Sequence, residues 1–105
     1  MNDQLTFDYS KPLTIADRFE EFDRLNPQVL RMLESKAARL IDRGWKRIGI
    51  GWLCEVLRYE YAIETNDPNS KFRLNNDFRS RYARLLIEKH PDWSDIIATR
   101  ELRSI

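Results

Sequence analysis

The chain has 105 residues, of which 33% are charged and 42% hydrophobic, and a formal net charge of +1. This length and composition are typical of one globular domain that buries its own core. A single cysteine excludes an intramolecular disulfide and a multi-cysteine zinc site, and no apolar run is long enough to span a membrane. We therefore expect one cytoplasmic domain at 14–105, preceded by an extended arm at 1–13.

Helical spacing of apolar residues dominates the first half of the chain. Thr14 and Asp17 have the pattern of a capping box, which predicts a helix over about 15–25. Asn26-Pro27 is a typical helix start, with Asn as N-cap and Pro at the first helical position. Gly44 is a typical helix end, so the second helix is expected to run from 27 to 43.

A third helix is predicted over about 50–63, after a brief strand at 46–48. One of its faces carries apolar residues at helical spacing. A second apolar stripe lies on the opposite face and consists of Trp52, Val56 and Tyr59. A helix that is apolar on two faces is either central in the core or part of an interface. We favour central burial, with a homodimer seam along the second stripe as the alternative.

The last third begins with a cluster of turn-forming residues at 64–70. The alternation at 71–74 indicates a short strand that could pair with 46–48. Asn75 or Asn76 then caps a fourth helix over about 77–89.

Pro91 ends the fourth helix and opens a last short helix to about Thr99, whose apolar residues dock back onto the body. The predicted fold is mainly α, a compact bundle of four to five helices with a small two-stranded β element. Its segment 46–89 would resemble a winged-helix or helix-turn-helix unit.

Signatures of enzymes are absent from the sequence. With one histidine there is no His-rich metal site, and neither GxxxxGK[ST] nor GxGxxG occurs. Cys54 lies on an apolar helix face, which predicts a buried structural thiol and not a reactive one. We expect a protein that is not an enzyme and needs no metal or cofactor.

Two stretches are strongly positive: 26–47 and 71–89 each hold six basic and two acidic residues. A helix pair after a short strand is how winged-helix proteins present a second helix to the major groove of duplex DNA. Asn and Arg side chains hydrogen-bond the edges of adenine and guanine, and Lys and Arg neutralise phosphates. The predicted nucleic-acid-binding residues are Lys46, Arg47, Lys71, Arg73, Asn75, Asn76, Arg79, Ser80, Arg81 and Arg84.

Two features weigh against this interpretation. The connector before the fourth helix is much longer than a usual helix-turn-helix turn. In addition, Arg81 and Arg84 each lie four residues from an acid, so that they could form the helix-surface pairs Asp77–Arg81 and Arg84–Glu88 instead.

Four stretches also carry a likeness to known sequences: FEEFDRLNPQV (19–29), RGWKRIGIGWLCEVLRYEYAIETND (43–67), KFRLNNDFRSRYARLL (71–86), and PDW with REL (91–93, 100–102). Through them the chain resembles a family of small uncharacterised proteins encoded in bacteriophages and prophages. The resemblance implies a bacterial cytoplasm and a phage-related role. The expected function is a small nucleic-acid-binding regulator, most simply one that binds DNA. The alternatives are an inhibitor or adaptor that binds a host enzyme or defence complex through the 52–59 stripe or the acidic first helix, and a structural homodimer.

Overall fold

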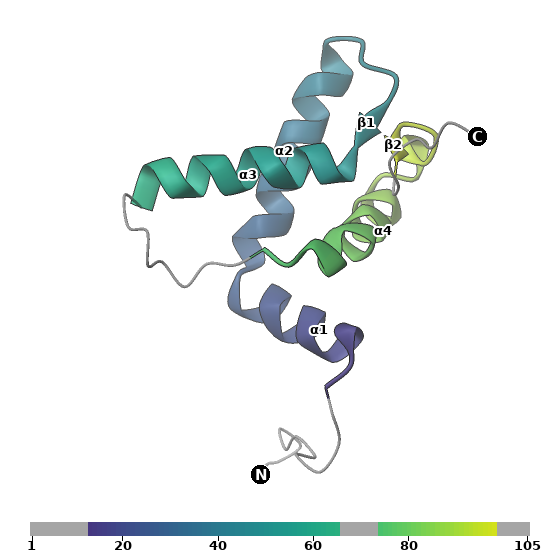
Figure 1. Cartoon of the computed structure of the whole chain (residues 1–105). Coiled ribbons are helices and arrows are strands. Elements are labelled where there is room, and N and C mark those ends of the chain that lie inside the picture. The colour runs from purple at the N-terminus through teal and green to yellow at the C-terminus, as the bar shows by residue number, and fades with distance from the viewer. Residues whose placement is uncertain (1–12, 66–73, 99–105) are drawn as a thin grey trace, which may run out of the picture.

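The computed structural model describes residues 13–65 and 74–98. Within these ranges the fold is mainly helical with a small two-stranded sheet, as the sequence predicts (Figure 1). The helices are α1 (Ile15–Leu25), α2 (Pro27–Asp42), α3 (Ile50–Thr65) and α4 (Arg79–Lys89), the 3-10 turns are η2 (Asn76–Phe78) and η3 (Pro91–Trp93), and the strands are β1 (Ile48–Gly49) and β2 (Ile97–Ala98). The predicted arm at 1–13 lies, apart from its last residue, outside the described residues. None of the described helices is long and apolar enough to span a membrane.

The capping box predicted at the start of α1 is confirmed. The hydroxyl oxygen of Thr14 accepts from the backbone N–H of Asp17 at 3.0 Å, and the Asp17 carboxylate accepts from the N–H of Thr14 at 3.1 Å. Asn26 occupies the N-cap position of α2, as predicted. The Asn26 side chain makes no capping bond to α2; its Nδ2 donates to the carbonyl oxygen of Phe22 at 3.0 Å and so closes α1. Pro27, with its preset φ, begins α2 without that bond.

The strand expected at 46–48 is found at Ile48–Gly49, but its predicted partner is wrong. β1 pairs in parallel with β2, with Ile48 opposite Ile97, while Leu74 lies in no strand and 71–73 lie outside the described residues. The predicted helix to Thr99 is also wrong, because only the 3-10 turn Pro91–Trp93 forms before the chain extends into β2. Burial explains the pairing: Ile48 and Ile97 are 1% and 4% exposed, so the sheet seals one end of the core.

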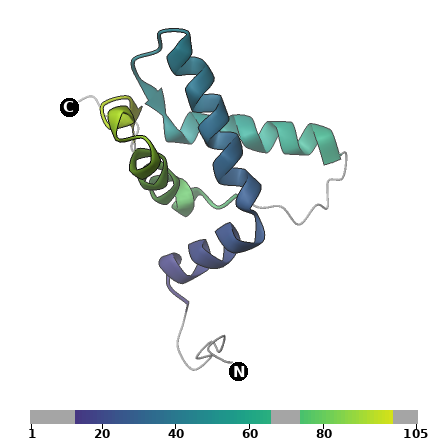
Figure 2. The ribbon, with the colours of Figure 1, turned by 180° about the vertical axis from the view of Figure 1, so that it is seen from behind.

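The core lies where α2 crosses α3 and where α4 packs against both (Figures 1 and 2). Each of these helices contributes buried residues at helical spacing: Val29, Leu33 and Ala37 from α2, Leu53, Cys54 and Leu57 from α3, and Tyr82, Ala83 and Leu86 from α4. α1 closes the bundle with Phe19, whose ring meets Phe78 and Tyr82 edge-on at centroid distances of 5.4 and 4.8 Å. Cys54 is fully buried, as predicted, and burial raises the pKa of its thiol to about 11.

A polar contact joins α2 to the end of α4. The Glu34 carboxylate accepts from Lys89 Nζ at 2.8 Å, and its other oxygen lies 2.6 Å from His90 Nε2. The His90 ring in turn stacks on Trp93 with a centroid distance of 3.9 Å. The hydrogen bond from Lys89 and then that from His90 hold the pKa of the Glu34 carboxyl below its ordinary value.

The expectation that α3 is buried on both faces is wrong. Trp52 is 45% exposed and Tyr59 68% exposed, and Val56 is only partly buried. Only the face with Leu53, Cys54 and Leu57 is turned into the core. Within the described residues, Trp52 and Tyr59 of the second stripe are thus exposed and Val56 is partly covered.

Candidate nucleic-acid interface

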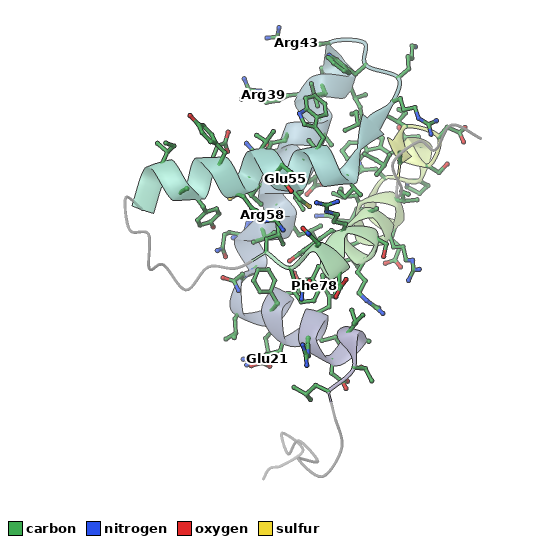
Figure 3. The ribbon with its side chains drawn as sticks, viewed as in Figure 1. Glu21, Arg39, Arg43, Glu55, Arg58 and Phe78 are labelled. Carbon is green, nitrogen blue, oxygen red and sulfur yellow. The ribbon has the colours of Figure 1, made fainter. Side chains whose placement is uncertain are left out.

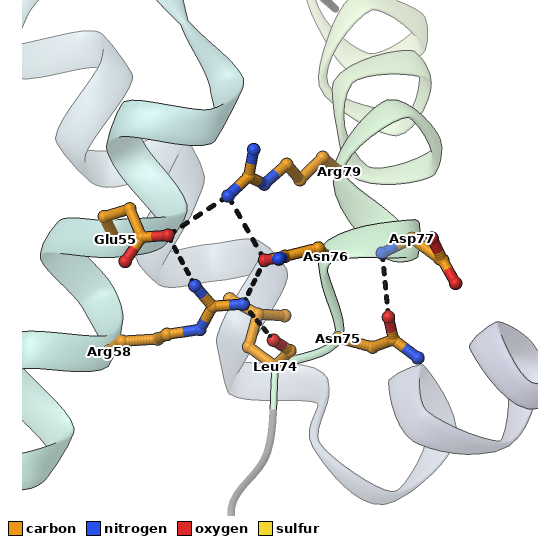
Figure 4. A network of polar contacts seen from close by, with 7 residues as sticks. All are labelled: Glu55, Arg58, Leu74, Asn75, Asn76, Asp77 and Arg79. Carbon is orange, nitrogen blue, oxygen red and sulfur yellow. Dashed lines mark hydrogen bonds and ion pairs between the residues drawn. The ribbon is translucent and has the colours of Figure 1, made fainter.

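The start of α4, where base-reading side chains were expected, is held by a network of polar contacts with α3 (Figure 4). Nη2 of Arg79 lies 3.1 Å from the Glu55 carboxylate and 3.1 Å from Oδ1 of Asn76. Arg58 pairs with the same Glu55 oxygen at 2.5 Å and donates to the Asn76 side chain and to the carbonyl oxygen of Leu74. Arg79 and Asn76 are therefore engaged within the protein, and a base contact would require these bonds to break.

Gly51 provides the space for this arrangement. A Cβ atom at position 51 would come within 3.0 Å of Nη1 of Arg79, so the absence of a side chain lets the guanidinium lie against the first turn of α3. Asn75 is engaged as well: its Oδ1 accepts from the N–H of Asp77 at 2.8 Å, which confirms the predicted cap, here of η2. Ser80 is half-buried.

Arg81 and Arg84 lie in a different setting, an open groove of about 410 Å³ that we call the α1–α4 groove. It is lined by Ala16, Phe19, Glu20, Asp23, Arg24, Arg81, Arg84, Leu85 and Glu88. The predicted pairs Asp77–Arg81 and Arg84–Glu88 are not formed as ion pairs in the described residues. The lining nevertheless holds three cationic and three acidic side chains, so the groove has no excess of positive charge to attract phosphates.

A second groove of about 300 Å³, the α2–α3 groove, has a different composition. It is lined by Lys36, Arg39, Leu40 and Arg43 of α2 and by Trp52, Leu53 and Val56 of α3. Lys36 pairs with Glu60 at 2.5 Å, whereas Arg39 and Arg43 form no ion pair with any described carboxylate. Figure 3 shows both arginines projecting from the last turns of α2, clear of the body of the molecule.

Trp52, which lines this groove, lies next to Trp45 of the loop after α2. Gly44 has φ of +95°, a left-handed conformation that ends α2, and the N–H of Trp45 then donates to the carbonyl oxygen of Leu40 at 3.1 Å. This turn brings the Trp45 ring to Trp52, with a centroid distance of 5.5 Å and an interplanar angle of 38°. Both indoles are about half exposed, at 47% and 45%.

Of the predicted site residues, the structure brings only some together. Lys46 and Arg47 are exposed and directly follow Trp45, whereas Lys71 and Arg73 lie outside the described residues. Trp45, Arg39 and Arg43 were not predicted as site residues. The available signal was the run Trp45-Lys46-Arg47 together with two arginines four residues apart at the end of the preceding helix.

No protein-family model matches the chain, and searches among curated proteins and among solved structures also find no match. We therefore base the functional assignment on the chemistry of these surfaces.

Proposed function

We propose that the protein binds nucleic acid through the face formed by the α2–α3 groove and the loop after α2. We call this the tryptophan–arginine face, and it consists of Arg39, Arg43, Trp45, Lys46, Arg47 and Trp52. One observation carries the proposal: two adjacent half-exposed indoles lie beside arginines that have no carboxylate partner among the described residues. Cations of this kind attract phosphates and release their counterions, while the indoles offer flat apolar area to bases.

The proposal moves the binding surface away from the start of α4. There, Arg79 and Arg58 both pair with Glu55, and the Asn76 side-chain oxygen already accepts from both arginines. Arg81 and Arg84 share their groove with as many acids as cations. Lys46 and Arg47, which the sequence predicts as nucleic-acid-binding residues, are exposed and belong to the proposed face.

We also propose that the protein acts without catalysis, as a regulator in the bacterial cytoplasm. The resemblance of its sequence to phage-encoded proteins supports this setting. The state of Cys54 supports a structural role for the thiol, because burial raises its pKa well above neutrality and the thiolate form is scarce.

The test compares binding of fluorescently labelled DNA, single-stranded and duplex, by the wild type and two double variants. Arg39→Ala/Arg43→Ala removes the two arginines that line the α2–α3 groove and form no ion pair with a described residue. Arg81→Ala/Arg84→Ala is the matched control, since it removes two arginines from the balanced α1–α4 groove.

We expect salt-sensitive binding by the wild type between about 50 and 200 mM salt, with the affinity falling as salt rises. The first double variant should lose about one unit of log–log salt slope per lost phosphate contact, and the control should keep the wild-type slope. A larger loss in the Arg81→Ala/Arg84→Ala variant would return the site to α4, and equal losses would refute the assignment to the tryptophan–arginine face alone. A folded wild type that binds neither form of DNA at low salt would refute the proposal.

A second candidate function is docking of a protein partner on the apolar stripe of α3. It is favoured by Tyr59 and Ile63, which are 68% and 62% exposed and extend the stripe beyond the groove. Sedimentation equilibrium of wild type and Tyr59→Glu tests the case in which the partner is a second copy of the chain. Self-association that this substitution abolishes would support the candidate, whereas a monomeric wild type would exclude the homodimer.

A further inference from the structure

We infer that the tryptophan–arginine face selects unpaired bases, so that its ligand is single-stranded nucleic acid in which a base stacks on Trp45 or Trp52. This inference rests on the proposed function and specifies its ligand. It begins from the contrast among the three tryptophans. Trp93 is 6% exposed and stacks on His90, as a core residue does. Trp45 and Trp52 contact each other and keep about half of their surface in water.

The surroundings of the indoles fit a flat aromatic ligand. Leu40, Leu53 and Val56 supply apolar lining, and Arg39 and Arg43 supply the charged part, because Lys36 is paired with Glu60. A volume of about 300 Å³ lies at the lower limit of small-molecule sites, which suits a single base more than a large ligand. Guanidinium groups can also stack on bases through cation–π contacts.

The spacing of the arginines fits a strand that passes across the groove. Arg39 lies in the last turn of α2 and Arg43 is its C-cap residue, so their backbones are about 6 Å apart along the helix axis. This is comparable to the distance between successive phosphates in an extended single strand. Lys46 and Arg47, next to Trp45, are exposed and can neutralise further phosphates on the loop side.

Duplex DNA cannot stack its paired bases on the exposed indoles of this face. In a duplex each base is covered above and below by its neighbours, so an indole can stack only on a base that has been flipped out or unstacked. Proteins that read a duplex present polar side chains to base edges. Asn75 and Asn76, the amides predicted for that role, are held by the N–H of Asp77 and by Arg58. The side chains exposed at the α2–α3 groove are indoles and cations, which suit stacking and not the reading of edges.

The test measures binding of one DNA sequence as a single strand and as a duplex, by wild type, Trp45→Ala, Trp52→Ala and Trp52→Phe. Tyr59→Ala is the matched control, because it removes an exposed aromatic from the same helix outside the groove. We expect the wild type to bind the single strand more tightly than the duplex. Each Trp→Ala change should weaken single-strand binding by roughly 5- to 150-fold, the range for loss of one stacked base. Trp52→Phe should retain much of the affinity, and Tyr59→Ala should bind as the wild type does.

The outcomes separate this inference from the proposed function. If the duplex binds as tightly as the single strand, or if both Trp→Ala variants bind single strands like the wild type, the inference is wrong. The proposed function would still stand in that case if Arg39→Ala/Arg43→Ala reduces binding. If the wild type binds neither form, both fail. Circular dichroism and thermal unfolding check each variant, and Trp45, which lies in a loop, gives the deciding variant should Trp52→Ala not fold.

Discussion

The α1–α4 groove and the α2–α3 groove are both open hollows lined by arginines, yet they differ in what stands beside those arginines. In the first, Arg24, Arg81 and Arg84 share the lining with Glu20, Asp23 and Glu88, and the aromatic residue is Phe19, which is 8% exposed. In the second, no described acid lines the groove, and the aromatic residue is the half-exposed Trp52. The first groove is thus the outer side of a packed helix pair. The second exposes an aromatic ring beside arginines that have no carboxylate partner among the described residues.

A count of basic residues does not locate a binding surface in this protein. The stretches 26–47 and 71–89 carry the same charge in the sequence. Folding places acids of α1 and α3 next to the cations of the second stretch, while Arg39 and Arg43 of the first keep no such partner in the described part of the chain. The electrostatic potential of a surface depends on these neighbours, because a cation and an acid in contact together produce little potential further away.

Substituting the aromatic residue of each groove should give the largest loss of stability and the clearest difference between the two grooves. Phe19→Ala should lower the free energy of unfolding by about 3–5 kcal/mol, because it leaves a cavity beside Phe78 and Tyr82. Trp52→Ala should cost only about 1–2 kcal/mol, since about half of its surface is already in water. Urea unfolding measures both. Equal losses would mean that Trp52 is a packing residue and would weaken the distinction between the grooves.

A smaller loss of stability is expected when the network that holds the start of α4 is broken. Arg58→Ala removes contacts to Glu55, Asn76 and the carbonyl oxygen of Leu74, and should cost about 1.5–3 kcal/mol because charged hydrogen bonds are lost. The control Arg31→Ala replaces an exposed arginine on α2 that has no ion pair in the described residues, and should stay within about 0.5 kcal/mol. DNA binding should be unchanged in both variants. A loss of binding on Arg58→Ala would show that this network belongs to the interface.

The smallest change in stability is expected when the pH is lowered. It involves Glu34 of α2, which contacts Lys89 and His90, whereas Arg39 of the same helix has no ion pair in the described residues. Hydrogen bonds from Lys89 and His90 hold the pKa of Glu34 below its ordinary value of 4.5 in the folded state. Its contribution to stability is therefore present above pH 4.5 and is lost as the pH falls through the folded-state pKa. Wild type should exceed Glu34→Gln in stability by on the order of 1 kcal/mol or less near neutrality, and the difference should shrink below pH 4.5.

Thermal unfolding at a series of pH values measures this difference. Glu88→Gln is the control, because Glu88 is an exposed carboxylate of the α1–α4 groove without an ion pair in the described chain. A difference between wild type and Glu34→Gln that stays constant with pH would contradict the assigned role of Glu34.

The sequence predicted the helices well and the contacts between them poorly. The bounds of α1 agree with the prediction to the residue, and α3 extends two residues further than expected. The single buried face of α3 was identified, but the exposure of its second stripe was not. Hydrophobic spacing shows that two faces are apolar, and it contains no information on whether a neighbouring element covers each of them.

The features that follow from the sequence alone are local ones. The capping box of Thr14 and Asp17, the start of α2 at Pro27 and the left-handed turn at Gly44 each depend on residues within four positions of one another. The pairing of Ile48 with Ile97, the contact of Arg79 with Glu55, and the contact of Trp45 with Trp52 beside a groove without described acids arise from the packing of the helices. These contacts depend on how whole helices pack, because the free energy of burying the shared core selects which surfaces meet and which remain in water.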